Sequence, residues 1–93
     1  MNLSKIDPDQ AWRMVLDQLQ MEMSKGSFNS WVRDTEFVAF EDDILTVGTS
    51  NAHACEWLTS RLTSTVARIL SGILNQPVNV QFVVLEKSST EKD

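Results

Sequence analysis

The sequence predicts an α+β fold in which helices pack on a small three-stranded sheet. Two stretches, 8–23 and 51–74, carry apolar residues at the spacing of amphipathic helices. A third stretch, 78–84, alternates apolar and polar residues, as a strand with one buried face does. With a short helix and a hairpin between the two long helices, the predicted order is helix, helix, strand, strand, helix, strand.

The first helix is predicted to begin after Asp7 and to run to about Met23. Pro8 suits the first helical position, and Gln10 stands roughly where a capping box places its Glu or Gln. Met14 and Met21 fall on the solvent side of this helix. At 100° per residue, the buried face is expected to carry Trp12, Val15, Leu16, Leu19 and Met23.

Gly26 is expected to allow the turn that ends the first helix, because glycine tolerates conformations that other residues avoid. A short second helix is predicted from Gly26 to Val32. Phe28 and Trp31 are expected to point inward, since so short a helix needs both to hold it on the core.

A hairpin is predicted to follow the second helix. The stretch 35–40 is rich in Phe, Val and Thr, which favours a strand, and 44–48 supplies the return strand. The acidic residues 41–43 lie between the two strands and are expected to form their turn.

The longest helix is predicted over 51–74, with Ser50 as its cap and Pro77 beyond its end. Trp57 lies off the apolar stripe, so it either packs against the first two helices or is exposed. The stripe itself comprises Cys55, Leu58, Leu62, Val66, Ile69 and Ile73.

The domain is predicted to occupy residues 1–85, with 86–93 as a tail. This last stretch is rich in Lys, Ser, Thr and Glu, a composition typical of disordered segments. It is therefore expected to be the start of a linker.

Composition and charge limit the class of partner. The chain has 93 residues, a net charge of −5 and scattered arginines, which argues against strong nucleic-acid binding that is independent of sequence. It contains no apolar stretch long enough to span a membrane, and its beginning lacks the apolar core of a signal peptide. The single cysteine, Cys55, fits a reducing compartment, so a cytoplasmic location is expected.

The sequence carries no pattern for catalysis or for a cofactor. His53 and Cys55 are two positions apart on a predicted helix, so they point about 200° apart and cannot form a nucleophile–base pair by themselves. Two such ligands are also too few for a structural zinc site. The acidic turn lacks the calcium-loop pattern, and the three glycines are too far apart for a phosphate loop. We therefore expect no enzyme, metal or cofactor, which leaves recognition of partners.

Tryptophan and methionine are the residues most suited to anchor such recognition, since they bury much area. Trp12 lies on the core stripe but near the beginning of its helix, so the pattern leaves a core position and an interface position equally open. Met14 and Met21 are either scattered surface residues or part of a contact.

The joint spacing of Trp12, Phe28, Trp31, Asn51 and Trp57 resembles the N-terminal domain of the bacterial replication initiator DnaA. The similarity covers about residues 8–85, with the alternating stretch 78–84 matching the family's last strand. The resemblance implies a KH-like arrangement of the predicted elements. It also implies an interaction module that self-associates, helps recruit the replicative helicase and binds initiation regulators.

The resemblance further implies where these contacts lie. Self-association would use the first helix, with Trp12 matching the family's aromatic residue and Met14 beside it. Helicase and regulators would use a patch formed by the second helix and the start of the long helix, comprising Lys25, Ser27, Asn51 and His53. Trp12 is also expected to contact partners. Asn51 matches the family pattern, whereas Ser27 and His53 depart from it.

Two alternatives remain beside this reading. One is a stand-alone adaptor or regulator with the same fold. The other is a KH-like nucleic-acid-binding module, but the RNA-clamping G-x-x-G loop is absent, so at most weak single-stranded DNA binding is expected.

Overall fold

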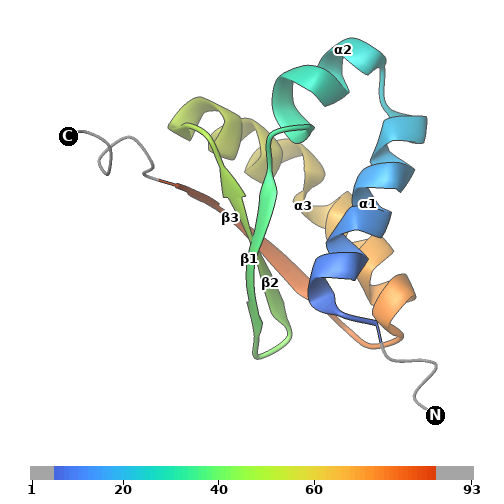
Figure 1. Ribbon diagram of the computed structural model, residues 1–93. Helices are drawn as coiled ribbons and strands as arrows, with labels where there is room; N and C mark the ends of the chain where they lie inside the picture. The colour runs from blue at the N-terminus through green and yellow to red at the C-terminus, as the bar shows by residue number, and fades with distance from the viewer. Residues whose placement is uncertain (1–5, 86–93) are drawn as a thin grey trace.

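The computed structural model describes residues 6–85 and confirms the predicted α+β order (Figure 1). Residues 1–5 and the predicted tail over 86–93 lie outside the described residues. The elements are α1 (Pro8–Glu22), α2 (Lys25–Ser27), the π-helix η1 (Phe28–Val32), β1 (Glu36–Glu41), β2 (Ile44–Thr49), α3 (Ala52–Leu74) and β3 (Asn79–Val84).

The three strands form one mixed sheet in the order β1-β2-β3. β1 and β2 pair antiparallel as the predicted hairpin, whereas β2 and β3 pair parallel. The register places Phe37 opposite Val47, and Val47 opposite Phe82 in the next strand. These three side chains therefore share the face that the helices cover. A bulge between Phe37 and Ala39 leaves Val38 exposed at the edge of the sheet.

The core lies between this face of the sheet and the helices α1 and α3, which pack against each other (Figure 1). Along α3 the fully buried residues recur every fourth position but omit Leu62, which is half-buried. The predicted stripe included Ile69, but Ile69 is half-buried and its neighbour Leu70 is fully buried. The buried face of α3 is therefore turned slightly from the predicted one. The buried apolar residues are Ala11, Trp12, Val15, Leu19, Phe28, Val32, Leu45, Val47, Ala54, Leu58, Val66, Leu70, Val78, Val80 and Phe82.

The turn between β1 and β2 consists of two aspartates with positive φ. Asp42 and Asp43 have φ of 53° and 64°, the pattern of a two-residue type I′ turn. Asp43 also holds the chain that enters β3. Its carboxylate accepts a hydrogen bond from Gln76 at 2.9 Å, and its carbonyl accepts one from the Asn79 amide at 2.8 Å. The hairpin is thus tied to the far end of α3.

The turn after α1 does not depend on Gly26, contrary to the prediction. Gly26 has an ordinary negative φ and lies inside α2. The helix direction changes instead at Met23 and Ser24, both of which are extended, and the Ser24 hydroxyl accepts a hydrogen bond from the Ser27 amide at 3.2 Å. A side-chain cap therefore starts α2 where a flexible residue was expected.

Gly48 marks a close approach between the sheet and the end of the described chain. A Cβ atom on Gly48 would overlap the side chain of Leu85. The Leu85 amide donates a hydrogen bond to the Thr49 carbonyl at 2.9 Å, so the chain after β3 continues along β2. Leu85 therefore lies on Gly48, on the face of the sheet opposite the helices.

Two glycine substitutions should move stability in opposite directions. Gly72 is exposed in α3, and an added Cβ would meet no atom within 4 Å. We expect Gly72→Ala to raise the free energy of unfolding by about 0.5–1 kcal/mol, because alanine favours the helix. We expect Gly48→Ala to lower it, because Leu85 must be displaced. Urea denaturation measures both, and equal effects of the two variants would contradict the close approach at Gly48.

Candidate protein-interaction surface

An aromatic surface forms where η1 meets the first turns of α3. We use this name for Trp31, His53, Trp57 and Arg61. The Trp31 ring stacks on Trp57 with centroids 4.9 Å apart and an angle of 7°, and it meets the His53 ring at 5.3 Å and 44°. The Arg61 guanidinium lies over the Trp57 ring, 5.7 Å from its centroid. Both tryptophans are half-buried, whereas His53 and Arg61 are exposed.

The π-helix η1 holds Trp31 against α3. The Arg33 amide donates to the Phe28 carbonyl at 2.9 Å, which closes the wider turn of a π-helix. Phe28 and Val32 are buried in the core, and the Thr35 hydroxyl donates to the Val32 carbonyl at 2.7 Å. The two buried residues fix the turn, so Trp31 contacts α3 rather than entering the core.

A shallow groove of about 240 Å³ runs beside this aromatic surface on α3. It is lined by His53, Glu56, Trp57, Ser60 and Arg61. The groove therefore offers an apolar ring face, one carboxylate and one guanidinium to a ligand of side-chain size.

Asn51 has a structural role that the sequence assigned to Ser50. Its side-chain oxygen accepts a hydrogen bond from the Ala54 amide at 2.8 Å, so Asn51 is the N-cap of α3. Its side-chain nitrogen donates to the Ser50 hydroxyl at 3.4 Å. Asn51 is nevertheless exposed, which leaves it accessible beside His53.

The remaining residues of the predicted partner patch precede Trp31. Lys25 is exposed in α2, and Ser27 is half-buried one turn before Trp31. The contact between Trp31 and His53 therefore joins the α2–η1 segment to the start of α3. Sequence reasoning placed Trp31 in the core and did not single out Arg61. It left Trp57 either packed against the first two helices or exposed, and the structure shows it half-buried and stacked on Trp31 of η1.

Trp12 lies in the core, so its expected role as a surface anchor needs correction. Its side chain is 3% exposed and packs in the same cluster as Val15 and Leu19. Its indole N–H is buried without a hydrogen-bond partner among the described residues. The buried face of α1 begins at Ala11, so Trp12 already lies where the helix packs on the core.

Met14 and Met21 are exposed on α1, as predicted, at 41% and 79%. Met14 lines a shallow groove of about 460 Å³ along the helix. Its other lining residues are Asp7, Asp9, Gln10, Arg13 and Asp17. The solvent side of α1 therefore combines apolar side chains with carboxylates.

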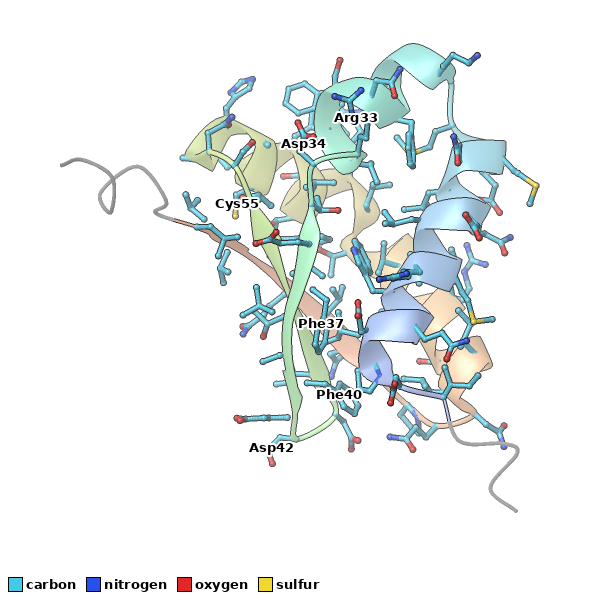
Figure 2. All side chains as sticks on the ribbon, in the orientation of Figure 1. Arg33, Asp34, Phe37, Phe40, Asp42 and Cys55 are labelled. Carbon is cyan, nitrogen blue, oxygen red and sulfur yellow. The ribbon has the colours of Figure 1, made fainter. Side chains whose placement is uncertain are left out.

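The two candidate reactive residues are not brought together by the fold. Cys55 is half-buried, not a fully buried core residue as expected, and its thiol donates to the Phe82 carbonyl at 3.2 Å, whereas His53 faces the aromatic surface. Residues 6–85 contain no group of three or more His, Cys, Asp or Glu placed to hold a metal ion. No helix in this range is long and apolar enough to cross a membrane. Figure 2 shows Cys55 beside β3, away from the acidic turn at Asp42.

The fold is that of the DnaA N-terminal domain. The crystal structure of a HobA–DnaA (domain I–II) complex from Helicobacter pylori matches with a TM-score of 0.69 and 17% identity. The match covers 80% of this chain and 95% of that chain. A likeness at this identity establishes the arrangement of helices and strands.

The sequence comparisons establish the family. The family model for the DnaA N-terminal domain matches residues 9–72. Chromosomal replication initiator protein DnaA of Nostoc sp. (strain PCC 7120 / SAG 25.82 / UTEX 2576) is 31% identical over 84 residues, which is 90% of this chain and 18% of the relative. The protein of the same name from Trichormus variabilis is 30% identical over 88 residues, which is 95% of this chain and 19% of that relative. The chain belongs to the DnaA N-terminal domain family and spans about a fifth of the length of these relatives.

Truncating Trp12 should unfold the domain rather than only alter its surface. We expect Trp12→Ala to lower the free energy of unfolding by about 3–5 kcal/mol, the usual cost of a large core cavity. Trp12→Phe should cost much less, because it keeps most of the ring volume and removes the unpaired N–H. Urea denaturation compares the two, and a well-folded Trp12→Ala variant would contradict the buried position.

Substitutions at Asn51 should separate its cap from any partner contact. We expect Asn51→Ala to lower the free energy of unfolding by about 1 kcal/mol through loss of the bond to Ala54. Asn51→Asp keeps an acceptor at the N-terminus of α3, where the helix dipole favours a negative charge, so stability should be retained. Thermal denaturation of the three proteins measures this, and equal loss in both variants would contradict the cap.

Proposed function

We propose that this chain is the protein-interaction domain of a DnaA-type replication initiator. It binds initiation regulators and the replicative helicase through the aromatic surface and its neighbours Lys25, Ser27 and Asn51. It also self-associates weakly. The proposal rests on family membership together with the aromatic surface formed by η1 and α3.

The stacked rings are the observation that carries this proposal. Trp31 and Trp57 are half-buried and stacked, so each indole is already fixed in orientation before a partner arrives. Large rigid aromatic residues and arginine are the residue types that dominate binding energy in protein interfaces. The exposed His53 and Arg61 flank the rings and supply polar groups around an apolar centre.

The solved relative supports a protein as the partner. That structure contains DnaA domains I–II in complex with the protein HobA. A chain with the same fold has the corresponding surfaces available for a regulator. The departures at Ser27 and His53 suggest a partner whose own contact residues differ from those of other family members.

Charge supports protein partners over nucleic acid. The net charge of −5 repels phosphate backbones, and the aromatic surface contains one arginine beside one glutamate in its groove. Any single-stranded DNA binding by this domain is therefore expected to be weak. A titration with single-stranded DNA at low salt measures it by fluorescence anisotropy.

A substitution at His53 tests the proposed surface. We expect His53→Asp to weaken binding of the source organism's purified replicative helicase by about tenfold or more, as loss of an interface hot spot does. His53 is exposed, so its change should leave the fold intact, which circular dichroism can verify. Surface plasmon resonance with the full chain immobilised measures the affinity.

The matched control is Gln81→Asp, an equal change of charge at an exposed position of β3. Its affinity should equal that of the unsubstituted chain. Equal affinities for the His53 and Gln81 variants would show that the helicase binds elsewhere, and absence of binding by the unsubstituted chain would remove the helicase from the proposal.

A further inference from the structure

The face of the sheet opposite α1 and α3 is not covered by any helix or strand within residues 6–85 (Figure 1). Strand pairing arranges the side chains of this face in three rows, each with one residue from β1, one from β2 and one from β3. The rows are Glu36, Gly48 and Val83; Ala39, Thr46 and Gln81; and Glu41, Ile44 and Asn79. We call these residues, together with Leu85, the outer sheet face.

The centre of the outer sheet face is apolar. Ile44, Val83 and Leu85 are half-buried there. The Gln81 side-chain amide donates a hydrogen bond to the Thr46 hydroxyl at 2.9 Å, so these two polar groups already have a partner on the surface. A shallow depression of about 160 Å³ lies beside them, lined by Ala39, Glu41, Asp42, Ile44, Thr46 and Gln81.

Every charge of the sheet is negative. β1 carries Glu36 and Glu41, the turn after it carries Asp42 and Asp43, and β2 and β3 have no charged residue. Neither ion pair found within residues 6–85 involves any of these four carboxylates. The outer sheet face therefore has an uncharged centre with an acidic margin along β1 and at the turn.

The two edges of the sheet are poor sites for a further strand. At β3 the edge is covered by α3, because the Cys55 thiol donates to the Phe82 carbonyl at 3.2 Å. Just before β3, the Ser71 hydroxyl accepts a hydrogen bond from the Val78 amide at 3.0 Å. At β1 the bulge after Phe37 interrupts the pairing, and bulges hinder edge-to-edge association. A partner is therefore expected to lie over the face rather than to extend the sheet.

The charge of this face also selects the chemistry of its partner. The stretch 86–93 of this chain does not match it, since that stretch contains no apolar residue and has three side-chain carboxylates against two lysines. A second copy does not match it either, because each copy has a net charge of −5 and like charges disfavour association. Nucleic acid is repelled for the same reason. Apolar side chains flanked by lysine or arginine complement the face.

We propose that the outer sheet face binds a basic amphipathic helix of a partner protein. The helix lies along β2, with its apolar stripe on Ile44, Val83 and Leu85 and its basic flank over Glu36 and Glu41. A strand of six residues spans about 20 Å, which a helix of about 13 residues matches in length. The sheet is then enclosed between two layers of helices. This surface is separate from the aromatic surface and does not rest on it.

Titration with a synthetic peptide tests the proposal. The probe is a fluorescein-labelled peptide of about 14 residues, with leucines on one helical stripe and lysines at the other positions. Its binding to the full chain, measured by fluorescence anisotropy, should saturate below about 1 mM and weaken between about 50 and about 300 mM NaCl. A control peptide with serine in place of each leucine keeps the charge and should bind about tenfold more weakly. Equal binding of the two peptides, or no saturation by the leucine peptide, would overturn the proposal.

Charge reversal on the chain shows where the peptide binds. We expect Glu41→Lys to weaken binding of the leucine peptide by about threefold or more, since it turns an attraction into a repulsion. Glu22→Lys makes the same change at an exposed position of α1 and should have less effect. Circular dichroism verifies that both variants are folded. Equal effects would mean that the peptide responds only to the net charge of the chain, and the proposal would be wrong.

Amide chemical shifts identify the contact without any substitution. Addition of the leucine peptide to isotope-labelled chain should shift the amide signals of Ala39, Thr46 and Gln81 more than those of Met14 and Trp57. The reverse pattern would place the peptide on α1 or on the aromatic surface and would exclude the outer sheet face. Helicase binding is measured separately, so failure of one surface can be told apart from failure of the other.

Discussion

Parallel pairing of β2 with β3 is the constraint on which the rest of the structure depends. Two neighbouring parallel strands cannot be joined by a tight turn, so the chain must cross from the end of one to the beginning of the other. α3 makes this crossing with 23 residues. At 1.5 Å per residue it is about 34 Å long, whereas six residues of strand span about 20 Å.

The excess length of α3 explains the position of the candidate site. Because the helix is longer than the strands it covers, part of it needs another cover, and η1 packs there with Trp31 on Trp57. The same crossing explains why α1 is needed. α3 alone cannot cover a three-stranded sheet, and α1 fills the space over β1 with Trp12, Val15 and Leu19. The site is therefore a consequence of how the core is closed.

The sequence predicted the elements of the fold better than the details at their ends. Apolar periodicity located both long helices and the alternation after residue 78 located β3, because burial of one face is a local pattern. The caps were less predictable. Ser50 and Asn51 are both good N-cap residues, and only the geometry shows that Asn51 bonds to Ala54. The turn after α1 was assigned to Gly26, yet the extended residues Met23 and Ser24 form it, which no glycine signal marks.

The candidate site was predicted only in part, because it is assembled from segments distant in the sequence. Exposure of Met14 and Met21 follows from one helical wheel and was predicted. The burial of Trp12 depends on where α1 begins relative to α3, and the stacking of Trp31 on Trp57 depends on the π-helical turn at Phe28. Neither relation is encoded in the spacing of a single helix. The family resemblance indicated that partners contact the second helix and the start of the long helix. The ring contacts between these two segments are seen only in the structure.

The contact of Leu85 with Gly48 also sets the starting point of whatever follows it. Leu85 is bonded to Thr49, which lies two residues before the cap of α3, so the chain leaves the sheet close to the first turn of that helix. A protein bound at the aromatic surface would lie near this exit. Any binding element connected there by a short tether would meet such a protein at high effective concentration. Weak individual contacts could then add to a durable assembly, and lengthening the tether would loosen it without altering a single residue of the surface.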